Sequence, residues 1–223
     1  MAYAEGYAGW PRWQAGDAAG ARPHFEEAVR LARESGADYL IMHTLGLLAW
    51  LERLEGHPDE LRRLLLEARP LAEAFRDRFR LAMYGIDLGL LASSEGDFER
   101  AVVELQAGLR AATEIGSMPF TTTGLAGLAG VLTARSGPAA AARLLAACES
   151  TWRDAEQYGF WRSYFDAAFE AALTRTQTAL SSEEFAQAWA EGQALSLDQA
   201  ADLALAELAA LSPDPSFSAD AGA

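Results

Sequence analysis

The sequence contains no lysine and no asparagine, and it has only one cysteine, Cys148, and three histidines. A single cysteine excludes an internal disulfide framework and is typical of proteins that fold in the reducing cytoplasm. No basic segment followed by an apolar run stands near the N-terminus, so the sequence gives no sign of a secretory signal. We therefore expect a cytoplasmic protein, and its 51% of hydrophobic residues are enough for a substantial core.

Positive charge is also scarce. The 18 basic residues, all arginine, stand against 32 acidic ones and give a formal net charge of −14. Direct nucleic-acid binding needs Lys and Arg to displace counterions from phosphate, so this charge balance argues against it. The longest uncharged run, Ile115 to Ala134, contains Pro119 and four glycines. These residues lower its hydropathy, and we interpret the run as a buried core helix and not as a membrane span.

An internal repeat is the strongest positive signal. Glycines recur at intervals of 40, 40 and 41 residues, at Gly16, Gly56, Gly96 and Gly137. Each precedes a helix-start signal, namely Asp17, His57-Pro58, Asp97 and Pro138. When the repeats are aligned on these glycines, the residues five, nine and twelve positions after the glycine are mostly apolar or small. The residues ten positions before it are mostly small. Steps of four and three keep these columns on one helical face.

Each period is expected to form helix A, a glycine turn, helix B and a short link. In the second period the pattern predicts an apolar helix from about Asp38 to Leu54 and an amphipathic one from about Pro58 to Phe75. Neither helix can bury its apolar face alone, so the hairpins must stack. We predict an all-α protein with four hairpins over residues 1–159, capping helices over residues 160–211 and a disordered tail over residues 212–223.

Two sequence patterns resemble known families. The small and apolar columns are similar to tetratricopeptide (TPR) repeats with a period near forty residues. The segment Phe185-x-x-Ala188-Trp189-x-x-Gly192-x-x-Leu195-Ser196-x-x-x-Ala200 resembles the end of the repeat region in large ATP-binding transcriptional activators of the LuxR type and related STAND signalling ATPases. The resemblance implies a right-handed superhelical stack and a non-catalytic interaction or regulatory domain of such a regulator. The chain has no phosphate-binding Gly-x-x-x-x-Gly-Lys loop, so ATP hydrolysis is not carried over.

The same resemblance implies a binding surface. In TPR-like repeats the concave wall is lined from helix A, at positions set by the small residue. In this chain these positions, together with two residues that lie one turn earlier in their helices (Arg80 and Thr121), are His43, Leu47, Trp50, Arg80, Met83, Asp87, Leu90 and Thr121. The expected partner is a protein, a peptide or another domain of a larger regulator. Core packing is the competing interpretation, because apolar residues at helical spacing usually face the interior.

Two aromatic groups offer further hypotheses. Trp152, Tyr158, Phe160, Trp161 and Tyr164 would line a pocket for a small-molecule inducer, or would simply pack in the core of a capping helix. Tyr3, Tyr7, Trp10 and Trp13 form a stripe near the N-terminus. This stripe would pack on the first helix B, or would mark the junction with a lost domain or a surface for homo-oligomer formation.

Catalytic and metal-binding patterns are weak in this sequence. The histidines His24, His43 and His57 fall on three different predicted elements and lack the i, i+4 spacing of a helical metal site. Cys148 lies in an alanine-rich helix, where we expect a buried and inert thiol. We therefore expect no enzyme, no metal site and no cofactor, and the sequence leaves protein docking and inducer sensing as the two alternatives.

Overall fold

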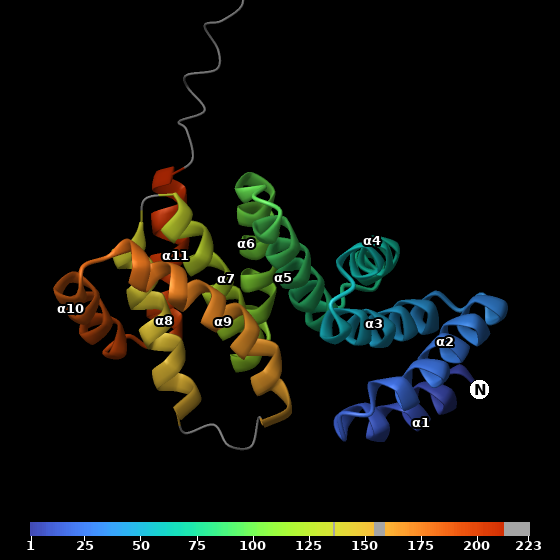
Figure 1. The fold of residues 1–223 in the computed structure, drawn as a ribbon. Coiled ribbons are helices and arrows are strands. Elements are labelled where there is room, and N and C mark those ends of the chain that lie inside the picture. Colours follow the sequence, from blue (N-terminus) through green and yellow to red (C-terminus); the bar gives the residue numbers. More distant parts are fainter. Residues whose placement is uncertain (136, 154–158, 212–223) are drawn as a thin grey trace, which may run out of the picture.

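The computed structural model describes residues 1–135, 137–153 and 159–211, and within these ranges it contains eleven helices and no strand (Figure 1). The helices are α1 (Ala2–Gln14), α2 (Ala18–Ser35), α3 (Asp38–Glu55), α4 (Pro58–Phe75), α5 (Arg78–Ser94), α6 (Phe98–Glu114), α7 (Met118–Ala134), α8 (Pro138–Arg153), α9 (Gly159–Ala179), α10 (Ser182–Gln193) and α11 (Leu197–Leu211). The all-α stack expected from the repeat is confirmed. None of the described helices has the length and apolar character that a membrane crossing requires.

Consecutive helices pack in antiparallel pairs, α1 with α2, α3 with α4, α5 with α6 and α7 with α8 (Figure 1). Successive pairs then stack through contacts of α3 with α2, of α5 with α4 and of α7 with α6. The predicted bounds of the second pair agree with α3 and α4 to within one residue. Helices α3, α5 and α7 are buried on most sides, whereas α2, α4 and α6 each bury one stripe, as the amphipathic pattern predicts.

A left-handed turn ends each of the first six helices. Positive φ angles occur at Gly16, Gly36, Gly56, Arg76, Gly96 and Gly116, which is one residue in every twenty. The forty-residue repeat is therefore two similar halves of twenty residues, each a helix and a turn. Arg76 adopts φ 53° where the other five positions have glycine, and L-residues pay a steric penalty in that region. Gly137 continues the glycine series in the sequence, but the next position of the twenty-residue series, residue 136, lies outside the described part of the chain.

Glycine also permits close contact between paired helices. A Cβ on Gly108 would lie 2.7 Å from the backbone nitrogen of Ile86, and one on Gly85 would lie 2.9 Å from the Gly108 Cα. The backbones of α5 and α6 therefore touch directly. In the third repeat, the position ten residues before the turn glycine is Ile86, where the repeat pattern predicts a small residue. In the structure the neighbouring Gly85 makes the close contact with α6 instead.

The last three helices close the stack in a different manner. Helix α9 packs along α7, α10 packs on α8, and α11 lies against both α7 and α8. A capping box at Ser181 begins α10, because the Ser181 hydroxyl and Glu184 satisfy each other's backbone N–H groups. Gly192 brings α10 onto α8, since a Cβ there would lie 2.2 Å from the Arg143 carbonyl oxygen. Two residues of the C-terminal motif, Ala188 and Gly192, are thus helix-packing positions.

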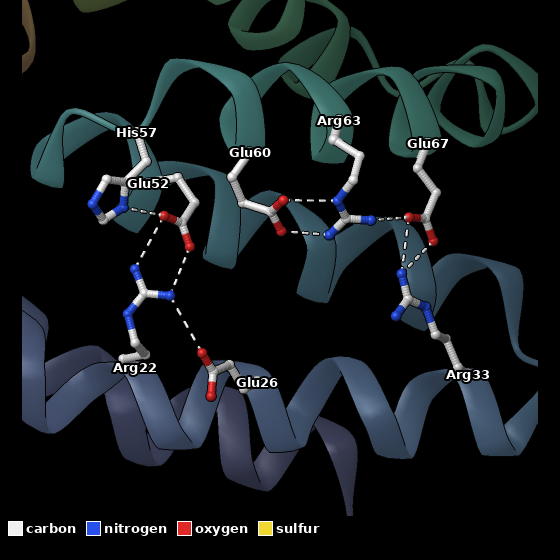
Figure 2. A network of polar contacts seen from close by, with 8 residues as sticks. All are labelled: Arg22, Glu26, Arg33, Glu52, His57, Glu60, Arg63 and Glu67. Atoms are coloured by element: carbon white, nitrogen blue, oxygen red, sulfur yellow. Dashed lines mark hydrogen bonds and ion pairs between the residues drawn. The ribbon is translucent and has the colours of Figure 1, made fainter.

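Arginine–carboxylate pairs join successive repeats along the even helices. Arg33 of α2 contacts Glu67 of α4 at 2.7 Å, and Arg69 of α4 contacts Glu104 of α6 at 2.6 Å. Figure 2 shows the first of these pairs beside Arg22, whose guanidinium binds both oxygens of the Glu52 carboxylate, at 2.7 and 3.0 Å. A planar guanidinium suits such two-point contacts better than a lysine ammonium does.

The left-handed turns make a direct stability prediction. Replacement of Arg76 by Gly removes the steric penalty at φ 53° and should stabilise the fold by about 1 kcal/mol. Gly56→Ala introduces the same penalty at φ 73° and should destabilise the fold by a similar amount. Thermal unfolding should show shifts of a few degrees in opposite directions. Equal effects of the two substitutions would contradict the assignment of a left-handed turn to position 76.

Candidate functional site

The candidate site is the surface formed mainly by the odd helices α1, α3, α5, α7 and α9, which we call the odd-helix wall. Two pockets open on this wall. We name them the Trp50 pocket and the Asp87 pocket after one lining residue of each. Helices α3 and α5 contribute to both pockets.

The Trp50 pocket has a volume of about 250 Å³ and lies between α1, α3 and α5. Its lining residues are Trp10, His43, Gly46, Leu47, Trp50, Phe79, Arg80 and Met83. The Trp50 ring stacks on Trp13 with centroids 5.3 Å apart and contacts Trp10 at 5.5 Å. Aromatic walls with few polar groups are typical of sites that bind apolar or aromatic groups.

The polar edge of the Trp50 pocket consists of His43 and Arg80. Burial and the nearby Arg80 charge lower the pKa of His43 to about 4, so the imidazole is neutral at pH 7. Neutral His43 can accept a hydrogen bond at Nδ1 from Arg80, with which it is in contact. Arg80 also donates to Asp77 at 2.7 Å. The cation is therefore held in place at the edge of an otherwise apolar pocket.

The Asp87 pocket has a volume of about 310 Å³ and lies between α3, α5, α7 and α9. Alanine and glycine residues of α7 and α9 form much of its surface, including Ala126, Gly130, Ala168 and Ala171. Small side chains leave space between helices that otherwise pack tightly. The charged residues at this pocket are Glu52, Arg53, Asp87 and Arg175, together with His57.

A buried cluster of Arg53, Asp87 and Tyr164 lies beside this pocket. Asp87 is 1% exposed, forms an ion pair with Arg53 and accepts a hydrogen bond from the Tyr164 hydroxyl at 2.8 Å. The Arg53 guanidinium also lies 3.8 Å from the centre of the Tyr164 ring and donates to the Tyr164 carbonyl oxygen. Burial raises the pKa of Asp87, although Arg53 and Tyr164 act in the opposite direction. The cluster joins α3, α5 and α9.

The predicted wall residues divide between the two pockets. Five of them, His43, Leu47, Trp50, Arg80 and Met83, line the Trp50 pocket. Asp87 and Leu90 line the Asp87 pocket. Thr121 is 4% exposed and lines neither pocket. The structure thus brings seven of the eight residues to cavities on one wall, and their role in binding stays a prediction.

The aromatic group predicted near the C-terminus is arranged differently. Trp152 is 4% exposed, stacks on Phe165 and donates its indole N–H to Thr122 at 2.8 Å. Tyr164 is 6% exposed and belongs to the buried cluster. Neither residue lines either pocket, so both are core residues here. Tyr158 and the side chains of Phe160 and Trp161 lie outside the part of the chain that the structure describes.

The rings of the N-terminal stripe contact α3, although α1 as a whole packs mainly on the first helix B, α2. Trp13 and Trp10 contact Trp50, and the Tyr3 ring lies 4.9 Å from that of His43. Tyr7 stacks on Tyr3 and remains 64% exposed. Helix α1 therefore extends the odd-helix wall with exposed aromatic side chains.

Sequence reasoning missed Arg53, because its importance comes from a partner 34 residues away. It also missed a group of possible cation ligands, Glu52, Glu55 and His57. Arg22 forms ion pairs with Glu52 and Glu55, so its guanidinium already provides the counter-charge that a cation would supply there. His57 Nδ1 lies 2.7 Å from Glu52. Cys148 is fully buried and its pKa is raised by burial, which agrees with an inert thiol.

Comparison with known proteins places the chain near bacterial regulators. No protein-family description and no solved structure matches it. Over 113 residues it is 34% identical to proteins named "Putative HTH-type transcriptional regulator" from Mycobacterium bovis and from two strains of Mycobacterium tuberculosis. The match covers 49% of this chain and 12% of each relative, so the chain corresponds to a small part of their length. This similarity is consistent with a regulatory role.

The buried cluster yields a prediction about stability and pH. Arg53→Met leaves the Asp87 carboxylate buried without its counter-charge, which should cost about 3–5 kcal/mol at pH 7. In this variant the folded state should hold a proton on Asp87 at pH values where the unfolded chain has released it. Stability therefore falls as pH rises, and the loss relative to wild type should be smaller at pH 5 than at pH 7.

Chemical denaturation at both pH values measures this effect, with Arg53→Met/Asp87→Asn as the control. The double variant has no uncompensated charge and keeps an oxygen for Tyr164, so it should recover much of the loss. A loss that is the same at pH 5 and pH 7, and that the second substitution does not reduce, would contradict the role assigned to the ion pair.

Proposed function

We propose that this chain is a non-catalytic, TPR-like regulatory module of a bacterial transcriptional regulator, and that it docks a protein segment on its odd-helix wall. The similarity to the mycobacterial regulators supports the regulatory role. The resemblance to the repeat regions of LuxR-type activators and STAND ATPases supports the same role. In that architecture other parts of the polypeptide bind ATP and DNA, and the repeats receive or transmit the signal.

One observation carries the docking proposal: exposed aromatic side chains continue the wall of the Trp50 pocket. Tyr3 and Tyr7 are 37% and 64% exposed, and both lie against His43, which lines the pocket. Aromatic residues and arginine dominate binding energies at protein interfaces. A partner segment can place one apolar side chain in the pocket and cover the two tyrosines, while Arg80 offers a positive charge at the edge.

The arrangement of reactive groups favours binding over catalysis. Catalysis requires a nucleophile, an acid and a base to converge on one point. His24 and His57 contact carboxylates on separate helix pairs, with Glu5 and Glu52 respectively. Cys148 lies in the core, where its sulfur donates to the Thr122 carbonyl oxygen. These groups are distributed over different elements of the described structure, which supports a non-catalytic module.

Inducer sensing is the second candidate. The two pockets support it, because each is lined by several helices and combines apolar walls with a few charged groups. On this view a small molecule would change how the helix pairs stack. The Trp50 and Asp87 pockets replace the Trp152 group as the places where such a molecule would bind.

An array of overlapping peptides that tile the Mycobacterium tuberculosis relative outside the matched segment tests the docking proposal. A peptide that binds is then titrated, with fluorescence anisotropy as the readout. Tyr7→Ser should weaken its binding by about fivefold or more, because an exposed aromatic contact is lost. Val103→Ser on α6 is a matched control, since Val103 is also 64% exposed and lies away from the odd-helix wall.

The control should bind as the wild type does. The proposal fails if no peptide binds, or if Tyr7→Ser and Val103→Ser weaken binding equally. A peptide that binds equally well to the wild type, Tyr7→Ser and Val103→Ser would show that docking uses another surface.

A further inference from the structure

The Asp87 pocket contains a carboxylate whose hydrogen bonding is incomplete. Asp87 Oδ1 receives both the Tyr164 hydroxyl and the Arg53 guanidinium. Asp87 Oδ2 accepts no hydrogen bond from any described group, and the side chain is fully buried. A buried polar atom without a partner costs about 1–3 kcal/mol, so native proteins rarely leave one without a reason. Asp87 lines the pocket but its side chain is fully covered, so an N–H or O–H group from the pocket can supply this bond once the covering side chains move aside.

A second charged group lies further along the same pocket. Arg175 lines it from α9, its side chain is exposed, and none of the described carboxylates pairs with it. Thirteen arginines of the described chain form ion pairs with carboxylates, and Arg175 is the one without such a pair that lines the pocket. An unpaired arginine beside a pocket is suited to a carboxylate or phosphate.

The α9 residues between these two groups define the shape of the pocket. Ala167, Ala168, Ala171 and Ala172 lie between Tyr164, which binds Asp87, and Arg175. Their spacing of three and four places them on one face of α9. The eleven residue-to-residue steps from 164 to 175 span roughly 16 Å along the helix axis. The long Arg175 side chain can shorten the gap between the charged ends by several ångströms. The pocket is thus an apolar trough with a hydrogen-bond acceptor near one end and a cation near the other.

We propose that the Asp87 pocket binds a small organic acid that carries an N–H or O–H donor at the end opposite its anionic group. The donor binds Asp87 Oδ2, the anion pairs with Arg175, and an apolar middle lies along the alanines of α9. The volume of about 310 Å³ is at the lower end of the range for small-molecule sites, which favours a compact ligand. Such a ligand bridges α5 and α9 and so stiffens the junction between the third pair and the closing helices. The inference goes beyond peptide docking and does not depend on it.

The probes are four compounds with the same six-carbon chain: 6-aminohexanoate, 6-hydroxyhexanoate, hexanoate and hexylamine. The first two carry both a donor and a carboxylate, whereas the last two carry one group each. Thermal unfolding and isothermal titration of the full chain measure binding. We expect the two-group compounds to bind about tenfold more tightly than hexanoate, which lacks the donor for Asp87, and about two- to fivefold more tightly than hexylamine, which lacks the anion for Arg175. At a hundred times the dissociation constant, a bound compound should raise the unfolding temperature by about 5–10 °C.

Three variants locate the binding site. Ala171→Trp fills the pocket from an exposed position and should abolish binding. Ala179→Trp makes the same substitution at an exposed position of α9 that does not line the pocket, and should bind as the wild type does. Arg175→Gln should weaken the three acids by about two- to fivefold and leave hexylamine unchanged, because exposed ion pairs contribute little.

Absence of a shift with all four compounds would overturn the proposal. Equal binding of one-group and two-group compounds, or retained binding in Ala171→Trp, would also overturn it. Each of these results leaves the peptide titration unaffected, since that experiment probes Tyr7 at the other end of the odd-helix wall.

Discussion

The backbone enters the left-handed region once in every twenty residues from Gly16 to Gly116, and the spacing of these turns fixes the length of each helix between them. Helices of equal length form hairpins that repeat, so equivalent positions in successive pairs meet the same neighbours. The next position of the series, residue 136, lies outside the part of the chain that the structure describes, and α7 still pairs with α8 across this turn. After α8 the simple pairing ends, and α9, α10 and α11 pack around α7 and α8 instead.

The regular period also explains the arrangement of charge. Arg33, Arg53 and Arg69 each pair with a carboxylate 34 or 35 residues later, which is one repeat minus about one and a half helical turns. A repeating structure brings such positions together whenever their helices lie side by side. Exposed pairs of this kind contribute little individually. Glu52 and Glu104 are only 2% and 7% exposed, however, so loss of their arginines would leave nearly buried charges.

Local sequence signals predicted the elements well and their long-range contacts poorly. Glycine and proline positions located the ends of α3 and α4, and Ser181 and Glu184 located the start of α10. These signals act within one helical turn, so a single sequence reveals them. The contact between α1 and α3 depends on how the pairs stack, which is why the ring contacts of the aromatic stripe with α3 were not predicted.

The candidate site shows the same division. The resemblance to TPR-like repeats pointed to most of the residues that line the two pockets, because it assigns fixed positions of helix A to the wall. It did not separate the wall into two pockets, since that depends on Arg53 and Tyr164 meeting at Asp87. These three residues belong to three different helices, and no local pattern links them. The C-terminal aromatic group is another example, because spacing alone does not distinguish the core packing of Trp152 from a pocket.

The cluster at Asp87 is difficult to explain by stability alone. Buried ion pairs often stabilise a fold no better than apolar residues of the same volume, because desolvation offsets the attraction. Their directional contacts nevertheless restrict the geometry, and here the Arg53 guanidinium fixes both the Tyr164 ring and the Tyr164 carbonyl oxygen. The start of α9 is thereby held against α3 and α5. Ala168 and Ala171 then face a pocket that leucines would otherwise fill, so the charged cluster and the small residues together keep this pocket open.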